Sequence, residues 1–440
     1  MVIVNPRPRG ARTLAARTKI ATAMSTALRA EIDSGAVRHV TLLVPDPHAR
    51  FAAVELGARF FSDTVLADGY GLCSYVFAWS PEREAVEAPV FEPYLATYGD
   101  LRLRPDLATL APGGDGAWFV VCDVEWPDGR VVDIAPRTVL RHQVEAAEKV
   151  GLVPSVGLEH EVTFTDRAGE PLTTGGLDYA TGHLDAMRPL LDAVRSAVDG
   201  LGIDVESRRG ECHPGQYELV LGHRDALAAC DDAMLQQLAV RKAAASRDVL
   251  ASYLAAERPA TGSSCHVHLS LSDVDGRSKF ADGPLLDYFV AGVLRAAPEL
   301  TPIWAPTWNS YVRLRTAPFS PRVVRWGVDD RTAAVRIAGA GESTRIEARF
   351  AGADAQPHLV VAAVLAAGLW GIREKLTAPA AAMLPATPWE ARQVLAESEL
   401  ARRLLGESVV DAQLALLDEE LDAGCDAVSD WQRRRGALRM

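Results

Sequence analysis

The sequence predicts an α+β protein, because stretches with helical spacing alternate with short runs of strand character. Helical patterns recur along the whole chain, at about residues 16–34, 137–150, 183–200, 224–255, 284–297 and 356–375. The C-terminal end of the chain also predicts helices joined by short polar turns. With 440 residues, of which 48% are hydrophobic, the chain is long enough for two or three domains with sizeable cores.

The N-terminal part predicts an arm and a small domain. Several arginines precede a helix at 16–34, which leads into an apolar strand pattern at 37–44. The Pro/Gly-rich segment 111–116 predicts a domain boundary, and a further strand follows it from Trp118 to Val124. The expected division is therefore a flexible arm, a small domain and a larger domain, at residues 1–15, 16–112 and 113–440.

Four short runs in the larger domain place Glu, His or Arg between apolar residues. They are Gly157–Val162, Glu211–Glu218, Ser264–Ser270 and Arg345–Phe350. Alternate side chains of a strand share one face and lie about 7 Å apart. If these faces converge, carboxylates, imidazoles and guanidiniums would line one cleft, which suits divalent metals and a polyanion. Two further strands are expected at about 309–314 and 332–338.

Each run taken singly also fits a half-solvated strand, and the set as a whole leaves two metal chemistries open. Three or more carboxylates suit Mg²⁺ or Mn²⁺, and an added imidazole slightly favours Mn²⁺. A zinc site would have to combine Cys212, His213, Cys265 and His266. Because Cys265 points to the opposite strand face from His266, zinc is the weaker alternative.

The composition argues against several classes of protein. A net charge of −12 disfavours non-specific binding to nucleic acid, which needs basic patches. The longest apolar run, 359–372, is too short to span a bilayer, and the N-terminus lacks the apolar core of a secretory signal. The six cysteines show no CxxC spacing, which fits free thiols in a reducing compartment. We therefore expect a cytoplasmic protein with no nucleic-acid or membrane partner.

Six segments occur in an order that resembles the glutamine synthetase superfamily. They are Glu159-His160-Glu161 (ExE), Glu211 to Glu218 with its central Pro-Gly-Gln, Gly262 to Ser270 (GSGxHxHxS), Asn309 to Leu314 (NSYxRL), Asp330 to Arg336 (NRxxxxR) and Arg345 to Phe350 (RIExR). Weaker similarity extends from Asp68 to Trp431. The chain has neither a Walker-type GxxxxGKS/T loop nor a GxSxG elbow, so side chains and metals would have to hold a nucleotide.

The resemblance implies a β-grasp-like N-terminal domain and a catalytic domain whose curved antiparallel sheet is flanked by helices. It also implies ATP and Mg²⁺ (or Mn²⁺) as cofactors, with two or three ions per site. The implied metal ligands form two sets, Glu161, Glu211 and Glu218 for one ion and Glu159, His266 and Glu347 for the other.

The same resemblance implies roles for residues around the metals. The γ-phosphoryl group and ADP would be contacted by Arg331, Arg336 and Arg345, and the nucleoside would lie near Ser270. A glutamate-like substrate would lie at Gly262 and between Arg313 and Arg349, since a guanidinium matches a carboxylate bidentately. The family also builds its sites between subunits, so Asp68 would complete the site of a neighbour. The implied homo-oligomer is a dodecamer of two stacked hexameric rings.

Two departures from the family bear on the substrates. True glutamine synthetases have a glutamate six residues after the arginine of NSYxRL, and counting from Arg313 this position is Phe319. An aromatic ring cannot replace a carboxylate as base for ammonium, but it can pack against an alkyl group or over a cation. This is similar to the γ-glutamyl-polyamine and γ-glutamyl-monoamine ligase branch. Thr261 replaces an asparagine that contacts glutamate, which leaves the identity of the acid open.

The expected function is an ATP-dependent ligase that joins glutamate to a small organic amine. Phosphorylation converts the carboxylate into γ-glutamyl phosphate, whose phosphate can leave when the amine attacks. Asp68 of a neighbouring subunit is the candidate for holding or deprotonating that amine. Two alternatives stay open: an ordinary glutamine synthetase that uses ammonium, and a non-catalytic assembly or regulatory relative.

Overall fold

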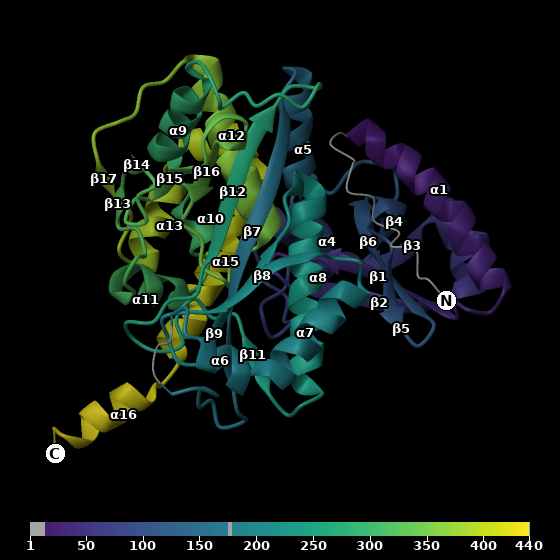
Figure 1. Ribbon diagram of the computed structural model, residues 1–440, viewed down its shortest axis with the longest axis horizontal. Coiled ribbons are helices and arrows are strands. Elements are labelled where there is room, and N and C mark those ends of the chain that lie inside the picture. The colour runs from purple at the N-terminus through teal and green to yellow at the C-terminus, as the bar shows by residue number, and fades with distance from the viewer. Residues whose placement is uncertain (1–13, 175–177, 440) are drawn as a thin grey trace.

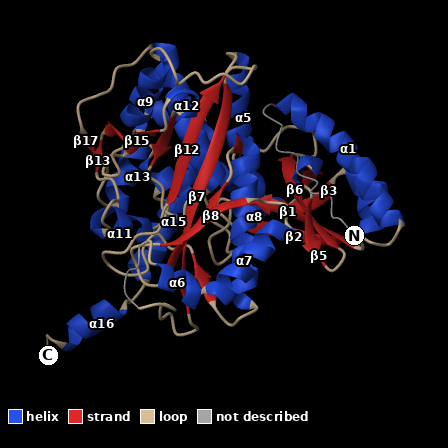
Figure 2. Cartoon of the chain, in the orientation of Figure 1, coloured by secondary structure: helices blue, strands red, loops and turns tan. Residues whose placement is uncertain are grey.

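The computed structural model describes residues 14–174 and 178–439 and has two large β-sheets and a two-stranded one, surrounded by helices (Figure 1, Figure 2). The expected flexible arm at residues 1–15 lies almost wholly outside the described residues. The predicted helix at 16–34 corresponds to α1 (Leu14–Asp33). No described helix combines the length and the apolar character needed to cross a membrane. The predicted α+β class is confirmed.

The small N-terminal sheet has a parallel pair at its centre. β1 (His39–Pro45) pairs in parallel with β6 (Ala117–Glu125) and antiparallel with β2 (Phe51–Gly57). β4 (Asp100–Pro105) pairs with β6, and β3 (Tyr70–Cys73) forms the edge beside β4. α1 lies along the outside of this sheet (Figure 1). A helix over a mixed sheet with a parallel centre is the β-grasp arrangement that the resemblance implied.

The segment expected to separate the domains belongs to this small sheet. β5 (Ala111–Gly114) pairs antiparallel with β6 across a tight turn. Val120 and Val124 of β6 are buried in the core of the small domain. The boundary predicted at residue 112 is therefore wrong, because it would separate β6 from both β1 and β4. The Pro/Gly content of 111–116 marks a hairpin turn rather than a linker.

The larger sheet has nine strands in the order β14-β15-β16-β12-β7-β9-β8, with β10 and β11 also paired to β7. Its pairings are antiparallel except for β14 with β15, and the long strands β7 and β12 cross the centre of the domain (Figure 1). The strands are β7 (Val153–Thr165), β8 (Val205–Gly210), β9 (Gln216–Leu221), β10 (Arg224–Asp225), β11 (Leu250–Ser252), β12 (Cys265–Ser272), β14 (Trp326–Val328), β15 (Val335–Ala338) and β16 (Arg345–Ala348). A separate pair is formed by β13 (Val323–Val324) and β17 (Ala382–Met383).

Long helices surround this sheet, some against its strands and others against those helices, and they follow most of the predicted ranges. They are α5 (Pro136–Lys149), α7 (Arg188–Gly200), α8 (Ala226–Ala245), α9 (Leu285–Ala296), α12 (Pro357–Glu374), α13 (Pro388–Ala396) and α15 (Glu407–Asp426). Shorter helices are α2 (Ala58–Phe60), α3 (Leu66–Asp68), α4 (Glu92–Leu95), α6 (Thr181–Ala186), α10 (Thr301–Trp304), α14 (Glu399–Leu405) and α16 (Asp430–Ala437). The helix expected over 224–255 ends at Ala245, because residues 250–252 pair with β7 instead.

The strand predicted at 309–314 is wrong, since this segment forms helix α11 (Trp308–Thr316). Thr307 caps the helix in a reciprocal capping box with Ser310. Tyr311 and Leu314 are buried and three residues apart, so they share one helix face. Over so few residues, the apolar pattern fits either period, and the cap decides for the helix.

The run Glu211–Glu218 is also not a single strand. β8 ends at Gly210 and β9 begins at Gln216, so Glu211 lies in the connecting turn while Glu218 lies in β9. The Glu211 N–H donates to the carbonyl of Gln216 at 3.0 Å, which closes the turn. Glu211 therefore lies close to Glu218 because of the turn, and not because the two residues alternate along one strand.

Candidate active site

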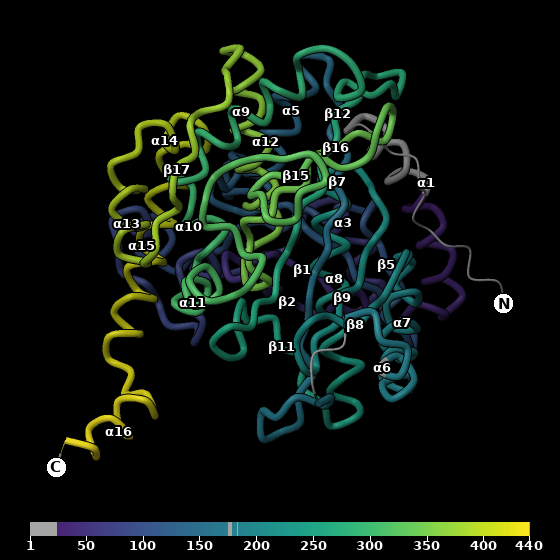
Figure 3. The backbone as a smooth tube through the Cα atoms, turned by 60° about the vertical axis from the view of Figure 1, so that its left-hand side comes forward, coloured from purple at the N-terminus to yellow at the C-terminus, as the bar shows by residue number. Residues whose placement is uncertain are grey.

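The register of the large sheet brings the predicted metal-ligand residues together. Glu159 of β7 lies opposite His266 of β12, and Glu161 lies opposite Glu218 of β9. On the other side of β12, Glu347 of β16 lies opposite His268. These strands lie side by side in both ribbon and tube views (Figure 1, Figure 3). Residues that are distant in the chain thus meet on one face of the sheet.

One cluster consists of Glu161, Glu211 and Glu218, which offer carboxylate oxygens within 4.8 Å of one another. The Arg209 guanidinium links two of them, with Nε 2.8 Å from Glu211 Oε1 and Nη2 3.0 Å from Glu218 Oε2. The Ser264 N–H and hydroxyl donate to Glu161 at 2.9 and 2.7 Å. The three carboxylates are therefore held in fixed positions from two strands and a turn.

A second cluster consists of Glu159, His266 and Glu347, again with ligand atoms within 4.8 Å. His266 Nδ1 lies 3.6 Å from Glu159 Oε2 and 3.5 Å from Glu347 Oε1. His268 Nε2 approaches Glu159 Oε1 at 2.8 Å, and Arg349 forms an ion pair with Glu347. Both ligand sets implied by the resemblance are therefore brought together by the fold, without either set sharing a member with the other.

The two clusters differ electrostatically. Burial and then repulsion from neighbouring carboxylates raise the pKa of Glu161 to about 7 and that of Glu218 to about 9. Burial alone would raise the pKa of Glu347, but His266 and Arg349 lower it to about 2. Burial and then Arg349 lower the pKa of His266 to about 4, so its imidazole is neutral near pH 7 and able to bind a metal. The first cluster is thus the one most in need of added positive charge.

Both clusters open into a cavity of about 320 Å³ that also contains most of the other predicted residues. Those lining it are Gly262, Arg313, Phe319, Arg331, Arg336 and Arg349. The buried Arg313 donates to the carbonyls of Phe350 and Arg349 at 2.8 and 3.3 Å, which leaves further N–H donors of its guanidinium. The buried Nε of Arg349 has no hydrogen-bond partner among the described residues. The cavity therefore joins acidic clusters to guanidiniums that can bind an anion.

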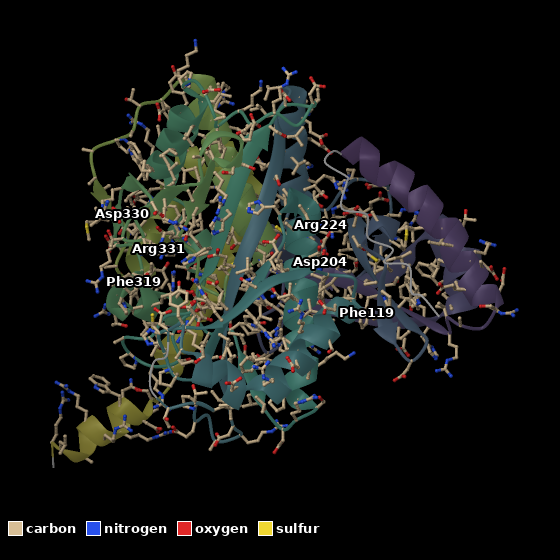
Figure 4. All side chains as sticks on the ribbon, viewed as in Figure 1. Phe119, Asp204, Arg224, Phe319, Asp330 and Arg331 are labelled. Carbon is tan, nitrogen blue, oxygen red and sulfur yellow. The ribbon has the colours of Figure 1, made fainter. Side chains whose placement is uncertain are left out.

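Phe319 and Arg331 lie on the same side of the molecule, the side on which α11 lies (Figure 4, Figure 1). Phe319 is 60% exposed and has a φ of 62°, which is uncommon for a residue with a bulky side chain. Asp330 accepts from the N–H and hydroxyl of Thr332 and pairs with Arg325 at 2.7 Å, so it shapes the turn that carries Arg331. An aromatic ring thus stands at the mouth of the cavity where the family's flap carboxylate was expected.

Three predicted residues lie outside the cavity lining. Arg345 is adjacent to the second cluster, with Nε 3.2 Å from His268 Nδ1. Ser270 lies further along β12, opposite Ser155 of β7. Asp68 ends α3 in the small domain and is exposed, and it is not part of the cavity lining within its own subunit. For Asp68, a role in catalysis would require a second subunit.

The sequence missed two residues that organise the first cluster. Arg209 pairs with two of its carboxylates, and the Gln216 amide donates to Glu161 at 2.8 Å and to the Gly262 carbonyl at 2.7 Å. Arg209 lies in β8 only two residues before Glu211, and its charge beside the motif is the signal that could have found it. The zinc alternative fails geometrically within the described residues, because the buried Cys265 packs into the hydrophobic core and joins neither cluster.

Comparisons with known proteins agree with this geometry. The family described as "Glutamine synthetase, catalytic domain" matches residues 133–436. The chain is 36% identical to gamma-glutamylethanolamide synthetase GlnA4 of Streptomyces coelicolor, over 94% of this chain and 95% of that protein. It is 31% identical to glutamate–isopropylamine ligase of a Pseudomonas species, over 87% and 91%.

Among solved structures, a "novel glutamine synthase homolog" superposes with a TM-score of 0.81 at 26% identity. The match covers 91% of this chain and 97% of that one. An "Apo GmaS without ligand" structure superposes with a TM-score of 0.81 at 25% identity, over 92% and 98%. These matches confirm the family and fold that the six motifs predicted. The chain belongs to the glutamine synthetase family and is a carboxylate–amine ligase whose relatives include monoamine ligases.

Proposed function

We propose that this protein uses ATP to join the γ-carboxylate of glutamate to a small organic amine, through γ-glutamyl phosphate. The observation that carries this proposal is the single cavity in which two metal-ligand clusters face Arg313, Arg331, Arg336 and Arg349. Similarity to two ligases that act on ethanolamine-type and isopropylamine substrates, according to their names, supports an organic amine as the acceptor.

The donor chemistry fits divalent cations. Hard carboxylate oxygens, with one neutral imidazole, suit Mg²⁺ or Mn²⁺, and the family generally uses ATP with such metals. Glu161, Glu211 and Glu218 would hold one ion, and Glu159, His266 and Glu347 another, with two or three ions per site. Bound metals would neutralise charge on the phosphates of ATP and on the transferring phosphoryl group.

The arginines of the site would bind the anionic groups of the nucleotide and of the acid substrate. Arg331, Arg336 and Arg345 would bind the transferring phosphoryl group and ADP, while Ser270 would lie near the nucleoside. Arg313 and Arg349 would hold the substrate carboxylate and the acyl phosphate. The Nε of Arg349 and the remaining N–H donors of Arg313, for which the described residues supply no acceptor, support this assignment. Both side chains are buried, so their charge is poorly screened and acts strongly on an anion.

The amine would enter at the mouth of the cavity, beside the exposed ring of Phe319. This ring can pack against an alkyl group or over an ammonium ion, which favours an organic amine over ammonium. Asp68 would reach the site from a neighbouring subunit and hold or deprotonate the amine. We therefore propose a homo-oligomer with sites between subunits, as in two stacked hexameric rings.

The test is phosphate release from ATP with glutamate and Mg²⁺, across ammonium, ethanolamine, short alkylamines and polyamines. Selective turnover of one organic amine would support the proposal and identify the substrate. Turnover of ammonium alone would show an ordinary glutamine synthetase and contradict the role given to Phe319. If no amine leads to phosphate release, while Mg²⁺ still raises the melting temperature, the acid substrate is a different one or the protein is a non-catalytic relative.

A further inference from the structure

Gln216 ends the Pro-Gly-Gln sequence of the second motif and begins β9, next to the first cluster. Its side chain is buried, and the amide nitrogen donates to Glu161 Oε2 at 2.8 Å and to the Gly262 carbonyl at 2.7 Å. The same nitrogen lies 3.3 Å from the Ser263 hydroxyl. A carboxylate and a carbonyl only accept hydrogen bonds, so the nitrogen of the amide, not its oxygen, faces them. One NH₂ group therefore joins an implied metal ligand to the loop that carries Gly262.

The backbone at Gln216 is fixed by the turn that precedes β9. The Gln216 N–H donates to the His213 carbonyl at 3.1 Å, and the Gly215 N–H donates to the Thr173 hydroxyl at 2.7 Å. Gly215 has a φ of 72°, and a Cβ there would lie only 2.6 Å from the carbonyl oxygen of Phe164, so this position requires glycine. The Gln216 side chain thus extends from a defined point towards Glu161 and Gly262.

The loop at residues 261–264 is a thin partition between two cavities. Gly262 and Ser264 line the candidate active-site cavity, whereas Thr261 and Ser263 line another cavity of about 290 Å³. Gln216 lines both. A segment with few packed neighbours depends on its hydrogen bonds for its position. The Gln216 amide supplies one such bond, and the Ser263 N–H supplies another, to the Ala255 carbonyl at 2.8 Å.

The position of this loop matters for the acid substrate. A Cβ at Gly262 would lie 2.7 Å from Ala317 Cβ and 3.4 Å from Arg313 Cγ, so the Gly262 backbone lies directly against the Arg313 side chain. A shift of the loop would therefore change the space beside this guanidinium. At the other end, Glu161 Oε2 accepts from both the Gln216 amide and the Ser264 N–H. A cation on Glu161 and an acid beside Gly262 thus act on the same amide group.

We propose that Gln216 is a positioning residue that couples cation binding at Glu161 to binding of the acid beside Gly262. The identity of the acid, glutamate, rests on the proposed function. A cation that holds Glu161 in one orientation fixes an acceptor of the Gln216 amide, and the amide then holds the Gly262 carbonyl in place for the acid. By linkage, the acid strengthens cation binding by the same factor.

The first test is calorimetric titration of the full-length protein with L-glutamate, with and without Mg²⁺ and in the absence of ATP. In wild type we expect Mg²⁺ to raise the affinity for glutamate by about fivefold or more. In Gln216→Met, which keeps the length of the side chain but has no donor, the two affinities should be nearly equal. Gln393→Met, on the exposed face of α13, is the matched control and should keep the wild-type factor.

A second test uses Mg²⁺ alone, so that it does not depend on the proposed acid. We expect Mg²⁺ to slow hydrogen exchange of the backbone amides at 260–263 in wild type and in Gln393→Met. In Gln216→Met this slowing should be lost, although calorimetry still detects Mg²⁺ binding. If wild type shows the slowing but binds no glutamate, the coupling stands and the proposed acid is wrong.

Other outcomes would overturn the proposal. They are a wild-type coupling factor in Gln216→Met, equal slowing of exchange in both proteins, loss of Mg²⁺ binding itself in the variant, and no effect of Mg²⁺ on the loop of wild type. A variant that only loosens the fold would weaken glutamate binding equally with and without Mg²⁺ and keep the coupling factor. Melting temperatures identify folded variants, and Gln216→Leu supplies a second side chain without a donor.

Discussion

Glu161 and Glu218 lie directly opposite each other in the register of β7 and β9, and both carboxylates are buried. Like charges opposite one another destabilise a sheet, and Arg209 contacts Glu218 but not Glu161 among the ion pairs of the described residues. The pair therefore stores an unfavourable interaction that a divalent cation would relieve. This relationship makes the metal assignment testable without any assay of catalysis.

Glu218→Gln replaces a buried ionisable carboxyl group by a neutral amide of the same shape. We expect the variant in chelator to be more stable than wild type near pH 7 by roughly 1–2 kcal/mol, because the wild-type carboxyl group, whose pKa is raised to about 9, must stay protonated in the folded state against its ordinary pKa. It should gain less stability on addition of Mg²⁺, and its turnover should fall by about 100-fold or more. Thermal denaturation with and without Mg²⁺ checks the first two effects. Glu206→Gln, an exposed glutamate of neighbouring β8, is the control, and a full Mg²⁺ response in Glu218→Gln would contradict the assignment.

Phe319→Glu restores a carboxylate at the mouth of the cavity. We expect turnover with ammonium to rise by about tenfold or more, because a base and counter-ion are supplied, while turnover with the preferred organic amine falls. Phe319→Leu removes the ring without adding charge and should weaken amine use without improving ammonium use. Steady-state kinetics with both acceptors measures this. Unchanged selectivity in Phe319→Glu would show that acceptor choice is made elsewhere.

Arg349→Lys keeps the positive charge but loses the planar fork of the guanidinium. We expect kcat/KM for glutamate to fall by about 100-fold, since a lysine cannot bind a carboxylate bidentately while also pairing with Glu347. The melting temperature should change little by comparison. Arg433→Lys, an exposed arginine of α16, is the matched control. Near wild-type kinetics in Arg349→Lys would remove this residue from the substrate site.

Arg137→Met tests a buried network that joins the domains. Arg137 is 3% exposed and pairs with Asp106 and Asp231 at 2.8 Å and also with Asp123. Its loss removes the guanidinium that balances the charge of the buried Asp231, which should cost roughly 3–5 kcal/mol of unfolding free energy. Arg130→Met breaks an exposed pair with Asp128 and should have little effect. Equal denaturation midpoints for the two variants would contradict this account.

The same network predicts how stability depends on pH. Burial alone would raise the pKa of Asp231, but Arg137 and His358 lower it below its ordinary value. A folded pKa below the unfolded one means that the stabilisation is present above the unfolded value of about 3.9 and is lost as the pH falls below it. The difference in stability between wild type and Arg137→Met should therefore shrink in acid. A constant difference across denaturation curves at several pH values would refute this.

Subunit mixing tests whether the active site is shared. Asp68→Ala and Glu161→Ala should each be inactive, because one lacks the neighbour's contribution and the other lacks a metal ligand. In a hybrid assembly, some interfaces combine the wild-type Asp68 of one subunit with the wild-type Glu161 of its neighbour. Dissociation and reassembly of a mixture should therefore restore part of the activity. Each variant reassembled alone is the control. A mixture as inactive as its components, in assemblies shown to exchange subunits, would place Asp68 outside the site.

Strand alternation carried much of the site prediction. Glu159 and Glu161 had to share a face in any strand that contains both, and the same holds for His266 and His268. The order of the six motifs then indicated the family, which the comparisons confirmed. Alternation therefore indicated which side chains share a face, and the resemblance to the family grouped them into the two candidate ligand sets that the fold brings together.

The sequence pattern did not predict the correct local structure where one pattern fits two different structures. The segment 309–314 fits a strand and a helix equally well until the capping box at Thr307 is seen. The Pro/Gly-rich segment 111–116 fits a linker and a hairpin turn, and the pairing of β6 with β1 and β4 decides between them. In both cases the deciding interaction is a hydrogen-bonding partner that the pattern itself does not contain.

The sequence by itself determined the residue types of the site, the faces they share on each strand, and the family. Only the tertiary structure decided the register that places Glu161 against Glu218 and Glu159 against His266. It also decided that Arg209 joins the first cluster. The physical reason is that alternation is a property of one strand, whereas register, burial and charge balance arise when strands and helices distant in the chain pack together.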